Sequence, residues 1–137
     1  MGDPSRAYFA FPGPLRDSLV AAILAGQKTS TTSLLIEYEH DDEPLPEVGE
    51  RSVVVDSEDK PVAVIETIDV RVIRLRDIDL AHAIDEGEGY ETVGAWRAGH
   101  EQFWHSPEMR SYLGDPAFAV TDDTLAVAER FRLVERL

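Results

Sequence analysis

The sequence has 137 residues, of which 27 are acidic and 13 are basic, so its formal net charge is -14. This charge argues against duplex DNA as a partner, whereas a nucleoside or a short single-stranded RNA would need few basic contacts. There is no cysteine, which excludes disulfides, thiolate metal ligands and a cysteine nucleophile.

The chain is long enough for one hydrophobic core, so we expect a single domain over residues 1–137. Residues 1–6 lack the charged and then apolar pattern of a signal peptide, and no apolar run reaches membrane-spanning length. We therefore expect a cytoplasmic protein without a membrane partner. Residues 1–12 predict an extended segment that lies on the body of the domain.

A helix is predicted over residues 14–25. Pro14 suits the first helical position, where its missing N–H forms no intrahelical bond, and Gly26 suits the left-handed residue that ends a helix. The apolar residues between them recur at helical spacing and predict one buried stripe: Leu15, Leu19, Ala22 and Ile23.

The next segment, residues 26–35, places Lys28 beside five consecutive hydroxyl residues, 29–33. Serine and threonine side chains compete with the helical ladder for backbone groups, so a helix is not predicted here. A desolvated lysine can take a proton from a neighbouring hydroxyl, which makes the segment a candidate for nucleophilic catalysis. The alternative is a polar loop that leads into a strand, which the apolar residues 34–38 predict.

An acidic loop follows at residues 39–50. His40, Asp41 and Asp42 could be taken for metal ligands, but nothing fixes their spacing for a metal. We interpret them as solvated loop residues, and no metal ligand is predicted from the residues alone.

Residues 51–56 predict a short β-branched strand, and residues 61–75 predict a longer one. Glu66 is predicted to share one face of the longer strand with five apolar residues: Val62, Val64, Ile68, Val70 and Val72. A carboxylate on such a face must be paired, neutral or at a water-filled pocket. It is either the partner of a buried arginine or of backbone donors, or a functional group.

A second helix is predicted between Asp77 or Asp79, as its cap, and Gly87. Three acidic residues crowd its C-terminal end, where the helix dipole disfavours negative charge: Asp85, Glu86 and Glu88. This placement indicates either a site or an exposed acidic cluster.

Thr92 is predicted to cap a third helix with an inner stripe that includes Trp96, His100 and Phe103, with Trp104 beside it. The tryptophans either stack on a base, as aromatics do in single-strand sites, or pack in the core. His100 is either a hydrogen-bonded core histidine or a base or ligand.

Residues 106–123 are predicted to be irregular, and residues 125–133 to form a closing strand. Four of its apolar residues are predicted to face inward: Leu125, Val127, Phe131 and Leu133. A small mixed barrel with helices over its openings fits this order of elements, and a flat α+β sandwich is the alternative.

Several segments are informative when they are taken together and in order: Gly26–Thr31 after the first helix, Leu45–Gly49, Val64–Thr67, Ala81–Gly89, the helix with Trp96, His100, Phe103 and Trp104, and Glu129–Leu133. Through these segments, and over most of its length, the chain resembles the ASCH domain family. The resemblance implies an α+β fold that is a PUA-like mixed β-barrel with flanking helices.

One branch of that family looks like small amidohydrolases that remove the acetyl group from N4-acetylcytidine with a threonine, a lysine and a glutamate. By position, the resemblance implies Lys28, Thr31 and Glu86 as these catalytic residues, with His82 four residues before the glutamate. These amidohydrolases have an arginine where this chain has Ser33. Another branch is linked to metal-assisted cleavage of single-stranded RNA.

The resemblance therefore implies a hydrolase acting on RNA-derived substrates, with a nucleoside or a short single-stranded RNA as its partner. A divalent metal is implied only for RNA cleavage, and a non-catalytic RNA- or nucleotide-binding module is the alternative. Six further residues are expected to contact the substrate: Ser30, Thr32, Glu66, Glu88, Trp96 and His100.

Lys28 and Thr31 are three residues apart, so they can meet only if the chain bends after Gly26. Burial would lower the pKa of Lys28 so that it accepts the Thr31 proton, while Glu86 orients the lysine or protonates the leaving amine. Replacing Lys28 or Thr31 by alanine is then expected to change stability little. We expect Glu66→Ala mainly to lower stability and Glu86→Ala mainly to lower activity.

Overall fold

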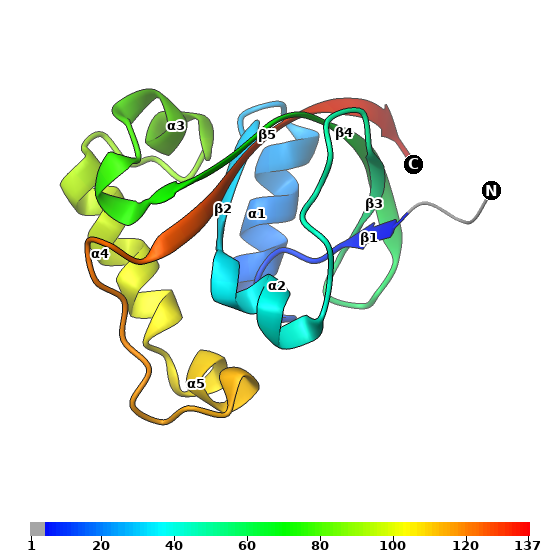
Figure 1. Cartoon of the computed structure of the whole chain (residues 1–137). Coiled ribbons are helices and arrows are strands. Elements are labelled where there is room, and N and C mark those ends of the chain that lie inside the picture. The colour runs from blue at the N-terminus through cyan, green and yellow to red at the C-terminus, as the bar shows by residue number, and fades with distance from the viewer. Residues whose placement is uncertain (1–4) are drawn as a thin grey trace.

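The computed structural model describes residues 5–137 and shows a mixed α+β fold built on one five-stranded sheet (Figure 1). The strands follow the order β1-β3-β4-β5-β2, and β1 pairs with β3 in parallel while every other pairing is antiparallel. Their bounds are Ser5–Ala7 for β1, Ser30–Leu34 for β2, Arg51–Val55 for β3, Pro61–Arg74 for β4 and Leu125–Arg136 for β5.

The sheet is open, because β1 and β2 lie at its two edges and do not pair with each other. The closed barrel expected from the sequence is therefore not shown, although the α+β class is. The two longest strands, β4 and β5, pair along most of their length and form the centre of the sheet. No helix within residues 5–137 is long and apolar enough to cross a membrane.

Five α-helices lie around the sheet in the described part of the chain, with a short 3-10 turn over Leu75–Asp77. Figure 1 shows α3, α4 and α5 gathered beyond one end of the sheet, while α1 lies near β2 and β5. Their bounds are Pro14–Leu24 for α1, Leu35–Asp41 for α2, Leu80–Asp85 for α3, Val93–Trp104 for α4 and Pro107–Leu113 for α5.

The core is divided into two clusters, and each includes residues of β5. The first packs α1 against the sheet and consists of Phe9, Leu19, Val20, Ile23, Val54, Ala63, Ile65 and Phe131. The second packs α3, α4 and α5 and consists of Leu34, Leu75, Ile78, Ala83, Trp96, Trp104, Met109, Phe118, Val120, Ala126 and Ala128. Burial of these side chains supplies most of the driving force for folding.

Most predicted elements are present. They include the first helix, the strands predicted at residues 51–56 and 61–75, the closing strand and the helices capped by Asp79 and Thr92. Asp79 accepts a hydrogen bond from the His82 amide, and Thr92 accepts one from the Ala95 amide. Residues 1–4 of the predicted extended segment lie outside the described residues, and residues 5–7 form β1.

Two local predictions are wrong. The apolar residues 34–38 do not continue as a strand, because Leu35–Asp41 forms α2 after the Glu37 carboxylate accepts a hydrogen bond from the Leu34 amide at 2.7 Å. Part of the segment predicted to be irregular is α5, which Ser106 caps through a hydrogen bond from the Met109 amide. Its signals, a serine followed by Pro107 and then a C-terminal glycine, are visible in the sequence.

The predicted inner face of the long strand is also wrong. Ala63, Ile65 and Thr67 are the buried residues of β4, whereas Ile68 is 48% exposed. The register against β5 shifts twice, between Val64 and Ile65 and between residues 67 and 69. The buried residues still alternate regularly from Ala63 to Thr67, so the error lies in the choice of face: both faces carry apolar residues in the sequence.

Candidate functional site

The structure brings Lys28 and Glu86 together from segments 58 residues apart. Lys28 is 2% exposed and Glu86 is 1% exposed, and the Lys28 Nζ lies 3.7 Å from the Glu86 Oε1. The ammonium also donates to the carbonyl oxygen of Ser30 at 2.8 Å and to that of Glu86 at 3.4 Å. The ion pair is therefore shielded from water, and these hydrogen bonds restrict the position of the Lys28 ammonium.

The two segments meet because their backbones can approach closely. Gly87 has a φ of +72°, and a Cβ at this position would lie 2.7 Å from the carbonyl oxygen of Gln27. Only glycine fits here, both for its backbone conformation and for lack of space. The Thr29 amide then donates to the carbonyl oxygen of Asp85 at 2.7 Å, and Arg130 on β5 pairs with the Asp85 carboxylate at 2.6 Å.

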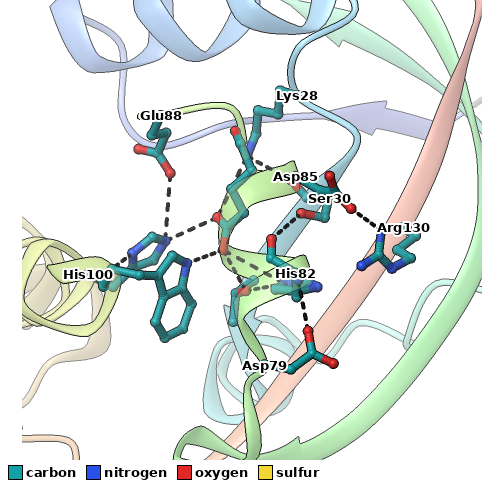
Figure 2. Close-up of polar contacts among 11 residues, drawn as sticks. Lys28, Ser30, Asp79, His82, Asp85, Glu88, His100 and Arg130 are labelled. Atoms are coloured by element: carbon teal, nitrogen blue, oxygen red, sulfur yellow. Dashed lines mark hydrogen bonds and ion pairs between the residues drawn. The ribbon is translucent and has the colours of Figure 1, made fainter. Parts of the chain in front are cut away.

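The carboxylate of Glu86 is the centre of the hydrogen-bond network. Its Oε2 accepts from the indole N–H of Trp96 and from the Thr32 hydroxyl at 3.0 Å, and its Oε1 lies 3.1 Å from the His100 Nε2. Figure 2 shows Lys28, Glu88 and His100 arranged around this end of α3. A carboxylate with this many donors stays ionised although it is buried.

His82 extends the network through Thr32. The single hydroxyl proton of Thr32 goes to Glu86, so the hydroxyl oxygen accepts from the His82 Nε2, 2.8 Å away. His82 is thereby held as the tautomer protonated on Nε2, and burial lowers its pKa. The Ser30 hydroxyl donates to the carbonyl oxygen of His82 at 2.8 Å, which ties β2 to α3.

The electrostatics of the cluster follow from its burial. Burial lowers the pKa of Lys28, and the negative charge of Glu86 only partly offsets this effect. Burial alone would raise the pKa of Glu86, but the hydrogen bond from His100 and the charge of Lys28 outweigh it and lower the value. Burial would lower the pKa of His100, yet its hydrogen bond with Glu86 raises it. The expected lowering of the lysine pKa is confirmed in direction.

Thr31 lies on β2 opposite Glu129 of β5, on the other face from Thr32. It forms no side-chain hydrogen bond with Lys28 or Glu86 in the described part of the chain. However, the Lys28 amine is bonded to the Ser30 carbonyl, which is the group that joins Ser30 to Thr31. The hydroxyl that contacts Glu86 directly belongs to Thr32.

Glu129 is a residue that the sequence analysis did not single out. Its carboxylate accepts a hydrogen bond from the Thr67 hydroxyl at 2.8 Å. Burial raises the pKa of Glu129, while the Thr67 bond and the charge of Lys28 act in the opposite direction. The signal that could have identified Glu129 from the sequence is its position directly after three apolar residues of the closing strand, 126–128.

Trp96 and Trp104 are 0% and 1% exposed, so in this arrangement neither can stack on a base. The Trp96 ring stacks on His100 instead, at 4.3 Å between ring centroids, and its N–H holds Glu86. Of the two alternatives for the tryptophans, packing in the core is therefore the one that the structure shows.

Glu66 lies apart from this cluster and does not face the core. Its carboxylate pairs with Arg51 and with Arg132, both at 3.1 Å, and the two arginine side chains are 55% and 51% exposed. The expectation of a buried Glu66 is therefore wrong, because the odd-numbered residues of this part of β4 face the core and Glu66 lies on the opposite face.

The members of the cluster that ligands can reach are the half-buried ones. The side chains of Glu88 and His100 are 19% and 13% exposed, whereas those of Lys28 and Glu86 are almost fully covered. Glu86, Glu88 and His100 also form a group whose possible metal-binding atoms all lie within 4.8 Å of one another. His40, Asp41 and Asp42 in the acidic segment are exposed, as expected of solvated residues.

The family model of the ASCH domain matches residues 6–135 of this chain. Among solved structures, the chain is similar to a protein from Enterococcus faecalis, with 25% identity and a TM-score of 0.82, over 99% of this chain and 79% of the other. It is also similar to an ASCH domain from Lactobacillus crispatus, with 28% identity and a TM-score of 0.79, over 94% and 78% of the two chains. No protein with a curated description matches it.

Proposed function

This chain belongs to the ASCH domain family, which is PUA-like and RNA-associated, and we propose that it is a hydrolase that acts on RNA-derived substrates at the cluster around Lys28 and Glu86. The observation that carries the proposal is the burial of this ion pair. Removing two charges from water costs several kcal/mol per ion, and apolar side chains of similar size would often be at least as stable. Costly groups with shifted pKa values gather at functional sites.

The substrate class that we favour is a modified pyrimidine nucleoside of the N4-acetylcytidine type. Its amide needs a nucleophile, a base and a group that stabilises the leaving amine, and the family resemblance assigns these roles to Thr31, Lys28 and Glu86. The net charge of -14 supports a small substrate over a long RNA, because few basic residues are available to neutralise phosphates.

In the proposed reaction Lys28 acts in its neutral amine form, which burial favours by lowering its pKa. The Thr31 oxygen forms a bond to the acetyl carbon while its proton passes to this amine. The tetrahedral intermediate then loses the nucleoside amine, which takes the proton back from Lys28. Water hydrolyses the acetyl ester on Thr31 and releases acetate. Glu86 balances the charge of Lys28 and holds the amine beside the start of Thr31.

A second candidate is metal-assisted cleavage of single-stranded RNA. The observation that favours it is the group formed by Glu86, Glu88 and His100, which combines two carboxylates with an imidazole. In that case the hydroxyl of Thr31 would not be required, because water would be the attacking group.

The test is to incubate the protein with N4-acetylcytidine and, separately, with single-stranded RNA, each with and without Mn²⁺. Release of acetate that is lost in Thr31→Ala supports the amidohydrolase. Thr29→Ala is the matched control, since it removes a hydroxyl two residues away that forms no side-chain hydrogen bond in the described structure. Both variants should unfold at similar temperatures.

Three other outcomes would change the assignment. RNA cleavage that requires metal and survives Thr31→Ala would replace the threonine mechanism with the second candidate. Acetate release that is lost in Thr32→Ala but kept in Thr31→Ala would move the nucleophile to the hydroxyl that contacts Glu86. No reaction, with RNA binding that weakens steeply as salt rises, would favour a binding module.

A further inference from the structure

We propose that Glu86, Glu88 and His100 bind one divalent transition-metal ion. The three side chains come from the end of α3, the loop after it and the middle of α4. The His100 Nε2 lies 3.1 Å from the Glu86 Oε1 and 3.8 Å from the Glu88 Oε2, and all three atoms lie within 4.8 Å of one another. A nitrogen and two carboxylate oxygens therefore converge on one point.

These separations are close to those of ligands on a common ion. Nitrogen and oxygen ligands lie about 2.0–2.2 Å from a metal such as Zn²⁺, so two of them are about 3 Å apart at a right angle and about 4.2 Å apart when they are opposite. The Glu86–His100 and Glu88–His100 separations fall within this range. The third pair, Glu86 with Glu88, lies within 4.8 Å.

His100 is held in the orientation that a metal ligand needs. Its Nδ1 donates to the carbonyl oxygen of Trp96, 2.9 Å away, which turns the Nε2 to the carboxylates; the Nε2 donates to Glu86 in this structure, and a bound ion would take the place of that proton. Metal-binding histidines commonly have this second hydrogen bond to a backbone carbonyl, which sets the tautomer. Stacking of the ring on Trp96 further restricts its rotation.

The two carboxylates differ in a way that also suits an ion. Glu86 has its Oε2 occupied by the Trp96 N–H and the Thr32 hydroxyl, which leaves the Oε1 turned toward His100. Glu88 is 19% exposed at its side chain and accepts no hydrogen bond within residues 5–137, and its Oε2 lies 3.8 Å from the His100 Nε2. A largely covered carboxylate without a donor lacks the partner that such groups normally have.

Lys28 is the group that opposes a cation, because its Nζ is 3.7 Å from the same Glu86 oxygen. Its shortest bond is instead to the Ser30 carbonyl, at 2.8 Å, so the ammonium is held on the side away from His100 (Figure 2). Two carboxylates together with the overall charge of -14 favour a cation near this cluster.

The donor set indicates the class of ion. One imidazole and two carboxylates suit Mn²⁺, Fe²⁺ or Zn²⁺ better than Ca²⁺, which takes six to eight oxygen ligands, or Mg²⁺, which keeps much of its water. Binding here does not depend on the proposed hydrolase activity. When bound, such an ion would polarise a carbonyl or phosphoryl oxygen of a substrate near the exposed side of the cluster.

The experiment is a calorimetric titration of the metal-free protein with Mn²⁺ and with Zn²⁺, without substrate. We expect one site per chain, with affinity for Zn²⁺ above that for Mn²⁺ and little binding of Mg²⁺. Glu88→Gln should weaken binding at least about tenfold, because it removes a ligand that forms no hydrogen bond in the fold. Thermal unfolding with Mn²⁺ should show a higher Tm for the wild type than for this variant.

Glu91→Gln is the matched control, since it removes one exposed negative charge three residues further along the same loop. It should bind Mn²⁺ like the wild type. Equal binding by the wild type and Glu88→Gln, or equal loss in Glu91→Gln, would overturn the site and leave only general attraction to an acidic surface. His100→Gln provides a second ligand variant, and retention of full affinity in it would also overturn the proposal.

Discussion

Glu86 and Glu66 are the same residue type in two very different surroundings. Glu86 is 1% exposed, with an ammonium, an indole, a hydroxyl and an imidazole around its carboxylate. Glu66 lies on the sheet surface between two arginines that are more than half exposed. Both are well paired, so the difference between them is the water that surrounds one and is excluded from the other.

The comparison shows that burial, and not the number of partners, decides what an ion pair contributes. In a dry environment, removing one partner leaves an uncompensated charge, whereas water and salt replace the partner at the surface. We therefore expect the larger loss of stability at Glu86 and the smaller one at Glu66, which is the opposite of the expectation from sequence for stability.

Glu86→Gln is the substitution with the largest expected effect on stability. The amide keeps the size of the side chain but leaves Lys28 buried without a carboxylate, so we expect a loss of about 3–5 kcal/mol in the free energy of unfolding. Urea unfolding measures it. The double variant Glu86→Leu with Lys28→Met should recover much of the loss, since it removes both charges together. A single variant as stable as the wild type would show that water reaches the pair.

Glu37 sharpens the comparison because it is a buried carboxylate without a cation. Burial raises the pKa of Glu37 to about 7 from an ordinary value of 4.5, although the hydrogen bond from the Leu34 amide acts against this. The folded protein then binds this proton more tightly than the unfolded chain does. The contribution of Glu37 to stability is therefore greatest below pH 4.5 and falls as pH rises through about 7.

Glu37→Gln should remove this fall, because the amide oxygen can still accept from the Leu34 amide but cannot ionise. We expect the variant to be more stable than the wild type above the folded pKa, by at most about 3 kcal/mol, and to lose this advantage in acid. Urea unfolding over a range of pH measures the difference. An unchanged pH slope in the variant would contradict the assignment of this pKa to Glu37.

The smallest effect is expected for Glu66→Gln. Its two arginines remain hydrated when the carboxylate is lost, so the Tm should stay close to that of the wild type, and any difference should vanish in high salt. Glu86→Gln should keep its full effect in the same salt. If salt reduced both effects equally, the surroundings of Glu66 and Glu86 would not differ in their access to water.

The sequence by itself was sufficient for the family and for most of the elements. Helix caps at Asp79 and Thr92, the glycine after the first helix and the β-branched strands depend on local backbone preferences, which each segment carries with it. The segment with Lys28 and the acidic end of α3 could also be recognised as unusual, because each violates a local preference.

Only the tertiary structure decided which side chains meet. Packing of the odd-numbered face of β4 against the core left Glu66 at the surface, and Gly87 allowed the loop of Lys28 to approach the end of α3. Packing between segments far apart in the chain decides whether a carboxylate is shielded from water. It also decides which threonine contacts that carboxylate and which histidine faces it. Local sequence preferences contain no information on these long-range contacts, since Lys28 and Glu86 meet only when segments 58 residues apart pack together.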